Sequence, residues 1–202
     1  MSKDWTGNKK STYATLGASN HTETERQTDD FYATIPESLK VFLERLKDDG
    51  IHLHESVWEC ACGQGHLSKT LEQAGFTVIS TDLVNRGYGE SNVNFLETEY
   101  KPEQVDILTN PPYKYAQQFV EHAMELSTDG DYVVMFLKIQ FLEGKARREL
   151  FKKYPPKYVY VFSERQTCAM NGDFDKYCQS ALCYCWYIWE KGFNGEPKIR
   201  WL

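Results

Sequence analysis

Short apolar runs alternate with amphipathic stretches along most of the chain. From residue 56 onward the apolar runs predict strands near 56–61, 77–81, 105–109, 132–137, 158–162 and 182–189. Between them, apolar residues at helical spacing predict helices near 66–74, 115–127 and 145–153. Strand then helix, repeated, is typical of a parallel sheet with helices on both faces. The last run follows its predecessor without a clear helix, so we expect an antiparallel strand there.

A polar segment precedes this alternating pattern. Residues 1–28 are rich in Ser, Thr, Asn, Lys and Glu without sustained periodicity, which predicts a flexible arm. An amphipathic helix is then expected from Pro36 to a stop at Gly50. A chain of 202 residues suits one domain, and no repeat or long linker divides it. We therefore expect a single domain over residues 29–202.

The net charge of −6 argues against a protein that holds nucleic acid mainly by blanket neutralisation of phosphates. Any such contact has to be local. One basic run offers it, although a solvated helix face is the commoner explanation of such a run. The run comprises Lys138, Lys145, Arg147, Arg148, Lys152, Lys153 and Lys157. Because no apolar stretch of about 18 residues occurs, we expect no membrane association and a cytoplasmic protein.

Six cysteines could in number form disulfides or a zinc site. Two C-x-C pairs, Cys60/Cys62 and Cys183/Cys185, lie inside predicted strands, and no C-x-x-C pair of the kind that encloses zinc occurs. Buried free thiols and no metal centre are therefore expected.

A glycine loop, Glu59-Cys60-Ala61-Cys62-Gly63-Gln64-Gly65, follows the strand near 56–61. Gly63 and Gly65 allow a tight turn and a close approach of backbone to ligand. Asp82 ends the next strand, where a carboxylate can accept both hydroxyls of a ribose. The loop has neither the third glycine of a dinucleotide fingerprint nor a P-loop G-K-[ST], which disfavours a phosphate-bearing ligand. A sulfonium nucleoside needs no phosphate cradle and fits these residues.

A second loop, Asn110-Pro111-Pro112-Tyr113, follows the strand near 105–109. Each proline fixes φ and lacks an N–H, and a residue before proline is extended, so the loop is stiff. It directs the Asn110 side-chain oxygen and a carbonyl of the two prolines at one point, beside the Tyr113 ring. A turn is the plainer interpretation, but ligands of open α/β sheets bind at the carboxyl ends of parallel strands. The loop is a candidate site for a planar amine.

With these motifs, the sequence resembles the S-adenosylmethionine-dependent DNA adenine N6-methyltransferases of the small, phage-like type, over about residues 29–191. The tetrapeptide stands as the family's catalytic motif without substitution, and the glycine loop is similar to its cofactor loop, which often has proline at the position of Cys60. The resemblance implies a Rossmann-like class I fold, with a mostly parallel seven-stranded sheet, helices on both faces and an antiparallel late strand. It implies S-adenosyl-L-methionine as cofactor and DNA as partner, for a monomer or weak dimer.

The same resemblance assigns residue roles. The catalytic residues are Asn110, Pro111, Pro112 and Tyr113, with a flipped base stacked on the tyrosine ring. Cofactor contacts fall on Phe31, Tyr32, Thr34, Glu59, Ala61, Cys62, Gly63, Gly65, Asp82, Leu83, Asn94, Phe95 and Asn110. Nucleic-acid contacts are expected at Lys138, Lys145, Arg147 and Arg165, the last in a connection over residues 163–180. Family members that read a defined sequence usually carry a separate target-recognition domain, for which we expect no room here.

Other functions fit parts of the pattern. RNA adenine and protein glutamine methyltransferases share Asn-Pro-Pro-Tyr, while Ser-Pro-Pro-Tyr is associated with cytosine N4, so Asn110 favours adenine or glutamine. The glutamine enzymes usually have an Asp-x-Gly-x-Gly-x-Gly loop and a larger N-terminal helical domain, and neither is present. The sequence does not distinguish DNA from RNA. A non-catalytic cofactor-binding module is disfavoured by the intact Asn110, Asp82, Gly63 and Gly65.

Overall fold

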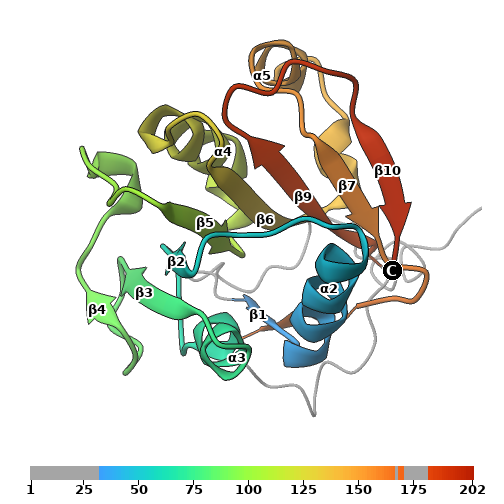
Figure 1. The fold of residues 1–202 in the computed structure, drawn as a ribbon. Helices are drawn as coiled ribbons and strands as arrows, with labels where there is room; N and C mark the ends of the chain where they lie inside the picture. The colour runs from blue at the N-terminus through green and yellow to red at the C-terminus, as the bar shows by residue number, and fades with distance from the viewer. Residues whose placement is uncertain (1–31, 167, 171–181) are drawn as a thin grey trace, which may run out of the picture.

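The computed structural model describes residues 32–166, 168–170 and 182–202. Its centre is an eight-stranded sheet in the order β10-β7-β9-β6-β5-β2-β3-β4 (Figure 1). The strands are β2 (Ser56–Glu59), β3 (Thr77–Asp82), β4 (Glu90–Ser91), β5 (Val105–Thr109), β6 (Tyr132–Lys138), β7 (Tyr158–Val161), β9 (Tyr184–Glu190) and β10 (Lys198–Trp201). The arm predicted over residues 1–28 lies outside the described residues.

Strand direction in the sheet follows the predicted class. The pairs β2–β3, β2–β5, β3–β4, β5–β6 and β7–β10 are parallel, and β9 runs antiparallel to both β6 and β7. The α/β class and the antiparallel late strand are therefore confirmed. The expected number of seven strands is wrong by one, because β10 adds an edge strand beside β7. Its four residues, Lys-Ile-Arg-Trp, form too short a pattern to predict.

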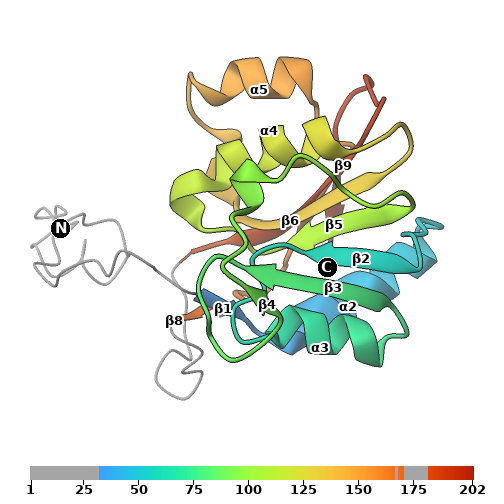
Figure 2. The ribbon, with the colours of Figure 1, turned by 90° about the vertical axis from the view of Figure 1, so that its left-hand side faces the viewer.

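Helices cover both faces of the sheet (Figure 2). Helices α2 (Pro36–Asp48) and α3 (His66–Gln73) pack on one face, and α4 (Ala116–Leu126) and α5 (Arg147–Lys153) pack on the other. Proline is tolerated at the start of α2 because the first N–H of a helix has no partner within the helix. On this face the Phe42 ring stacks on Trp186 of β9 at 4.8 Å between centroids. No helix in the described ranges is long and apolar enough to cross a membrane.

A second, two-stranded sheet lies apart from the first. Strand β1 (Tyr32–Thr34) pairs antiparallel with β8 (Cys168–Met170), in a register that places Thr34 opposite Cys168. It joins the segment before α2 to the segment after β7. Neither strand was predicted, because three residues are too few for a periodic pattern. The rest of the predicted 163–180 connection, residues 167 and 171–180, lies outside the described residues.

The cysteines described with their side chains are free thiols. Cys60, Cys62 and Cys185 are buried and Cys183 is half-buried, as expected for strand positions in the core. Burial raises the pKa of the Cys62 and Cys185 thiols to about 12, so both stay protonated near neutral pH. Cys178 lies outside the described residues.

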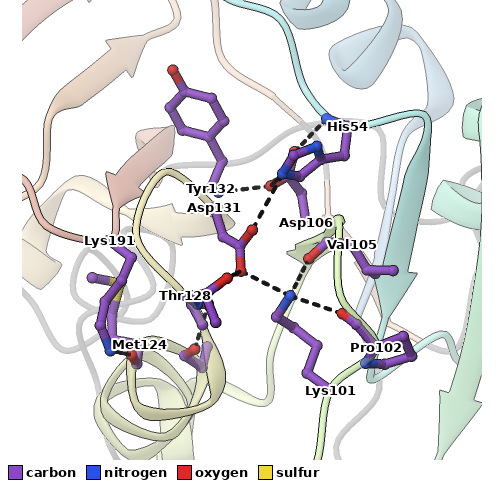
Figure 3. A network of polar contacts seen from close by, with 12 residues as sticks. His54, Lys101, Pro102, Val105, Asp106, Met124, Thr128, Asp131, Tyr132 and Lys191 are labelled. Carbon is purple, nitrogen blue, oxygen red and sulfur yellow. Dashed lines mark hydrogen bonds and ion pairs between the residues drawn. The ribbon is translucent and has the colours of Figure 1, made fainter.

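A buried polar network fixes the amino ends of β5 and β6 (Figure 3). Asp106 of β5 accepts backbone N–H bonds from His54 at 2.6 Å and Tyr132 at 2.7 Å. Asp131 accepts from the Lys101 ammonium at 2.9 Å and lies 3.2 Å from Nε2 of His54. The grouping of His54 with the two aspartates has the spacing of a metal site. Because the aspartate oxygens already accept N–H groups and the ammonium, we interpret the network as structural.

Replacing Lys101 by methionine will lower the free energy of unfolding by about 3 kcal/mol, because it leaves the Asp131 carboxylate buried without its cation. The two side chains are 1% and 4% exposed. Urea unfolding of the variant measures the loss. The matched control is Lys152→Met, which breaks an exposed pair with Glu149 and will cost less than about 1 kcal/mol. Equal losses for the two variants would contradict the structural role of Lys101.

Candidate active site

The carboxyl ends of the parallel strands meet at one edge of the sheet. Glu59 ends β2, Asp82 ends β3, Thr109 ends β5 and Lys138 ends β6. At this edge lies a hollow that is open to solvent. Its lining residues come from β1, β2, the glycine loop, α3 and the loop after β5. They are Ala33, Thr34, Glu59, Ala61, Cys62, His66, Leu67 and Asn110.

The glycine loop turns through two left-handed residues. Gly63 has φ of 57° and Gly65 has φ of 79°, a backbone conformation that residues with a Cβ rarely adopt. The Gly63 N–H donates to Oδ2 of Asp82 at 2.7 Å, and Val84 N–H donates to Oδ1 at 2.8 Å. Asp82 thus holds the loop, and each of its oxygens keeps lone-pair capacity for a ligand hydroxyl.

A buried carboxyl group joins the two central strands of the site. Thr109 Oγ1 donates to Glu59 Oε1 at 2.5 Å, and the Ala61 N–H lies 3.4 Å from the same oxygen. Glu59 is 1% exposed, and burial raises the pKa of this carboxyl to about 8, against the opposing effect of both hydrogen bonds. Glu59 is therefore mostly neutral near pH 7 in the structure described, although it lines the hollow.

The Thr34 hydroxyl is a buried polar group in the wall of the hollow. It is 2% exposed and has no hydrogen-bond partner among the described residues. A buried hydroxyl without a partner costs about 1–3 kcal/mol, so such groups in native proteins generally have one. A polar ligand atom in the hollow would satisfy it.

The Asn-Pro-Pro-Tyr loop borders the hollow on the side of β5. Asn110 directly follows β5 and is half-buried in the lining. The Pro112 carbonyl accepts the Tyr115 N–H at 2.8 Å, which starts the short helix η2 (Tyr113–Tyr115). Since the Pro112 carbonyl is used in this turn, the Pro111 carbonyl is the candidate for the second group, beside the Asn110 side-chain oxygen, that accepts an N–H from an amine. The stiff loop expected from the sequence is thus built as a turn into a helix.

Tyr113 belongs to an aromatic and cationic group beside Asn110. Its ring lies 5.9 Å from the Tyr184 ring, which stacks on Phe136 of β6 at 5.1 Å. The Lys138 ammonium lies 4.8 Å from the centre of the Tyr113 ring, within the range of a cation–π contact. Of the basic residues predicted to contact nucleic acid, Lys138 is therefore the one placed against the tetrapeptide.

The other predicted nucleic-acid contacts are Lys145, Arg147 and Arg165. Lys145 and Arg165 are exposed. Arg147 begins α5, where its guanidinium lies 5.1 Å from the Phe141 ring centre and donates to the Gln140 carbonyl at 3.2 Å. Arg147 is thus partly used within the protein, and contact of these three residues with nucleic acid stays a prediction.

Several predicted cofactor residues do not line the hollow. Asn94 caps the short helix η1 (Phe95–Glu97), its side chain accepting the Leu96 N–H at 3.2 Å. Phe95 is 2% exposed and packs in the core against Trp58 and Phe119. Leu83, next to Asp82, is 56% exposed. Phe31 and the Tyr32 side chain lie outside what the structure describes, so these contacts remain predictions.

Three lining residues were missed from the sequence. Ala33 adjoins the predicted Thr34, and His66 and Leu67 begin α3 directly after the glycine loop. Burial and then the charge of Lys69 lower the pKa of His66, which keeps its imidazole neutral near pH 7. The position of His66 and Leu67 in the sequence could have predicted their place in the lining, because the first turn of a helix after a glycine loop faces the same ligand as the loop.

Comparison with solved structures identifies the fold. Over 83% of its length the chain matches the methyltransferase subunit of a type I restriction-modification system from Streptococcus thermophilus, with TM-score 0.59 and 12% identity, and spans 46% of that chain. It matches a proposed RNA methyltransferase from Pyrococcus horikoshii with TM-score 0.55 and 16% identity, over 80% of this chain and 87% of that one. A proposed class I S-adenosylmethionine-dependent methyltransferase from Listeria monocytogenes matches with TM-score 0.51 and 14% identity, over 84% and 65%.

These matches show the Rossmann-like fold of class I methyltransferases, as the sequence predicted. The chain spans less than half of the restriction-modification subunit. No protein-family model matches the sequence, and no curated protein sequence matches it significantly.

Glu59→Gln will make the stability of the protein less dependent on pH. The pKa of Glu59 is raised from 4.5 to about 8, so the stability it contributes is full below pH 4.5 and is lost as pH rises through about 8. At about pH 9 the wild type will have lost roughly 4 kcal/mol relative to the variant. Urea unfolding across this pH range measures the difference, with the exposed Glu103→Gln as control. Parallel curves for wild type and Glu59→Gln would contradict a neutral buried carboxyl.

Proposed function

We propose that the protein is an S-adenosylmethionine-dependent methyltransferase that transfers a methyl group to the exocyclic N6 amine of adenine in DNA. The observation that carries the proposal is the place of Asn110. This residue lines the hollow that also contains Thr34 and Glu59, and it begins the loop that leads to the Tyr113 ring. A methyl donor bound in the hollow and an amine held by the loop would therefore both lie beside Asn110.

The residues present fit the cofactor. Gly63 and Gly65 let the backbone approach a ligand closely, and Asp82 retains acceptor capacity for ribose hydroxyls. The Thr34 hydroxyl, which has no partner among the described residues, suits the polar methionine end, and exposed Leu83 offers an apolar surface to the adenine of the cofactor. When bound, S-adenosylmethionine supplies an electrophilic methyl group on a positively charged sulfur.

The loop after β5 prepares the amine. The lone pair of an adenine N6 amine is delocalised into the ring, which makes the nitrogen a poor nucleophile. Asn110 Oδ1 and the Pro111 carbonyl would each accept one N–H, drawing the nitrogen toward tetrahedral geometry. Neither group has to act as a strong base, because the proton is lost to water after the nitrogen has gained its methyl group. Positioning and electrostatic stabilisation would provide most of the rate acceleration.

The surface beside Asn110 suits a base removed from a duplex. A planar base can stack on Tyr113, a contact worth about 1–3 kcal/mol, which offsets the few kcal/mol needed to flip it. Lys138 lies next to this ring, where its ammonium can meet the backbone of the flipped nucleotide. We expect Lys145, Arg147 and Arg165 to add to this contact, which would give the local contact that a chain of net charge −6 requires.

The proposal includes the wider organisation expected from the sequence. Residues 29–202 would form one catalytic domain, acting in the cytoplasm as a monomer or weak dimer. An RNA adenine or a protein glutamine is the alternative acceptor, since either amine would fit the same two carbonyl groups.

Transfer of tritium from labelled S-adenosylmethionine to unmethylated DNA, RNA and protein tests the proposal. We expect label in DNA. Asn110→Ala will lower the turnover rate about 100-fold or more, because one acceptor that acts on the reacting amine is lost. Binding of S-adenosylhomocysteine to this variant, measured by calorimetry, will weaken far less than the turnover rate falls, because Asn110 is one of several groups that line the hollow.

The exposed Gln118→Ala on α4 is the matched control and will keep the wild-type rate. Label found only in RNA, or only in protein, would show that the acceptor is an RNA adenine or a protein glutamine instead of DNA. Cofactor binding without transfer to any polymer would favour a non-catalytic module. An Asn110→Ala protein that methylates at the wild-type rate would refute the proposed role of the loop.

A further inference from the structure

The segment after Asp82 folds back onto the glycine loop. Its Tyr88 ring lies against Gly65, so closely that a β-carbon built on Gly65 would come within 2.4–2.6 Å of three ring atoms. Gly65 also has a left-handed backbone, with φ of 79°, and is the N-cap of α3. The glycine is thus required twice, once for the backbone conformation and once for the space that the ring fills.

Helix α3 fixes the Tyr88 side chain in this position. The phenol hydroxyl donates to Glu72 Oε1 at 3.0 Å, and the Lys69 ammonium lies 4.8 Å from the ring centre. These residues are three apart on α3, so they face the same side of the helix. Because α3 begins at Gly65, the ring joins the body of the helix to the loop that precedes it.

The backbone around Tyr88 is fixed as well. The Tyr88 carbonyl lies 3.7 Å from the Cys62 thiol, which is buried in the glycine loop. The next residue, Gly89, has φ of 67°, and a β-carbon there would come within 2.6 Å of the Ser80 carbonyl oxygen and 2.9 Å of Cys62 Sγ. Tyr88 is therefore held between the glycine loop and β3 by contacts that leave little freedom.

We propose that Tyr88 is a positioning residue for the cofactor: its ring holds the glycine loop in the shape that receives the nucleoside. The proposal rests on the proposed function. Two glycines make this loop flexible in isolation, and a flexible loop has to be ordered when the ligand binds. Asp82 fixes the loop on one side through the Gly63 N–H, and Tyr88 fixes it at Gly65. Tyr88 itself is absent from the lining of the hollow, so it acts through the loop.

Calorimetric titration with S-adenosylhomocysteine tests the inference on the full-length protein. Tyr88→Ala will weaken binding about tenfold, because the loop then has to be ordered when the ligand binds, and the entropy lost in ordering it lowers the affinity. The KM for S-adenosylmethionine will rise to a similar extent, and the turnover rate at saturating cofactor will change less than about twofold, since Tyr88 touches no reacting atom. Tyr88→Phe keeps the ring on Gly65 and will restore most of the affinity. The matched control is Tyr100→Ala, which removes a ring that is 70% exposed.

A double-mutant cycle with Gly65→Ala separates the contact from general loss of stability. The left-handed strain at residue 65 is present in both backgrounds, whereas the clash with the ring exists only when Tyr88 is present. Gly65→Ala will therefore weaken binding several-fold less in the Tyr88→Ala background than in the wild type. Additive effects, or wild-type affinity in Tyr88→Ala, would overturn the inference while the proposed function stands. Failure of the wild-type protein to bind S-adenosylhomocysteine would overturn both.

Discussion

The hydrogen bond from Thr109 to Glu59 joins the neighbouring strands β5 and β2 at the point where both end. Both loops of the site start from this bond, since the glycine loop continues from Glu59 and the Asn-Pro-Pro-Tyr loop continues from Thr109. A buried carboxyl is costly to ionise, and its raised pKa shows that the fold keeps this one mostly neutral. If the proposed function is right, the distance between a cofactor in the hollow and an amine at Asn110 depends on a short, buried contact between β2 and β5.

The amino and carboxyl ends of the parallel strands carry different kinds of polar contact. At the amino ends, Lys101 and Asp131 form a buried ion pair, and Asp106 receives two backbone N–H groups. These contacts fix how β5 lies against β6. At the carboxyl ends, the polar groups face a hollow, and one of them, the Thr34 hydroxyl, has no partner among the described residues. A buried ion pair thus lies at one edge of the sheet, and a buried hydroxyl without a partner among the described residues lies at the other.

Much of this arrangement could be predicted from the sequence. The apolar run 105–109 coincides with β5. Glu59 and Gly63 lie at the end of one predicted strand, Asp82 ends the next, and Asn110 follows a third, which placed all four at one edge of a parallel sheet. The strong signals were those with a local cause, such as glycines at left-handed positions and prolines after a strand.

What could not be predicted depends on contacts between distant segments. Pairing of β1 with β8 joins three residues near position 33 to three near position 169, and no sequence pattern in either segment predicts this pairing. The Tyr88 ring on Gly65 and the burial of Lys101 are likewise properties of the folded chain. The core position of the Phe95 ring against Trp58 and Phe119 is another such property, and the cofactor contact that the resemblance implies for this residue stays a prediction.

The most direct test of the account identifies the methylated base. Unmethylated DNA would be incubated with the protein and S-adenosylmethionine, digested to nucleosides and analysed by mass spectrometry. We expect N6-methyldeoxyadenosine, the product that follows if Asn110 and the Pro111 carbonyl accept the amine as proposed. N4-methyldeoxycytidine as the product, or DNA without any methylated nucleoside, would contradict it.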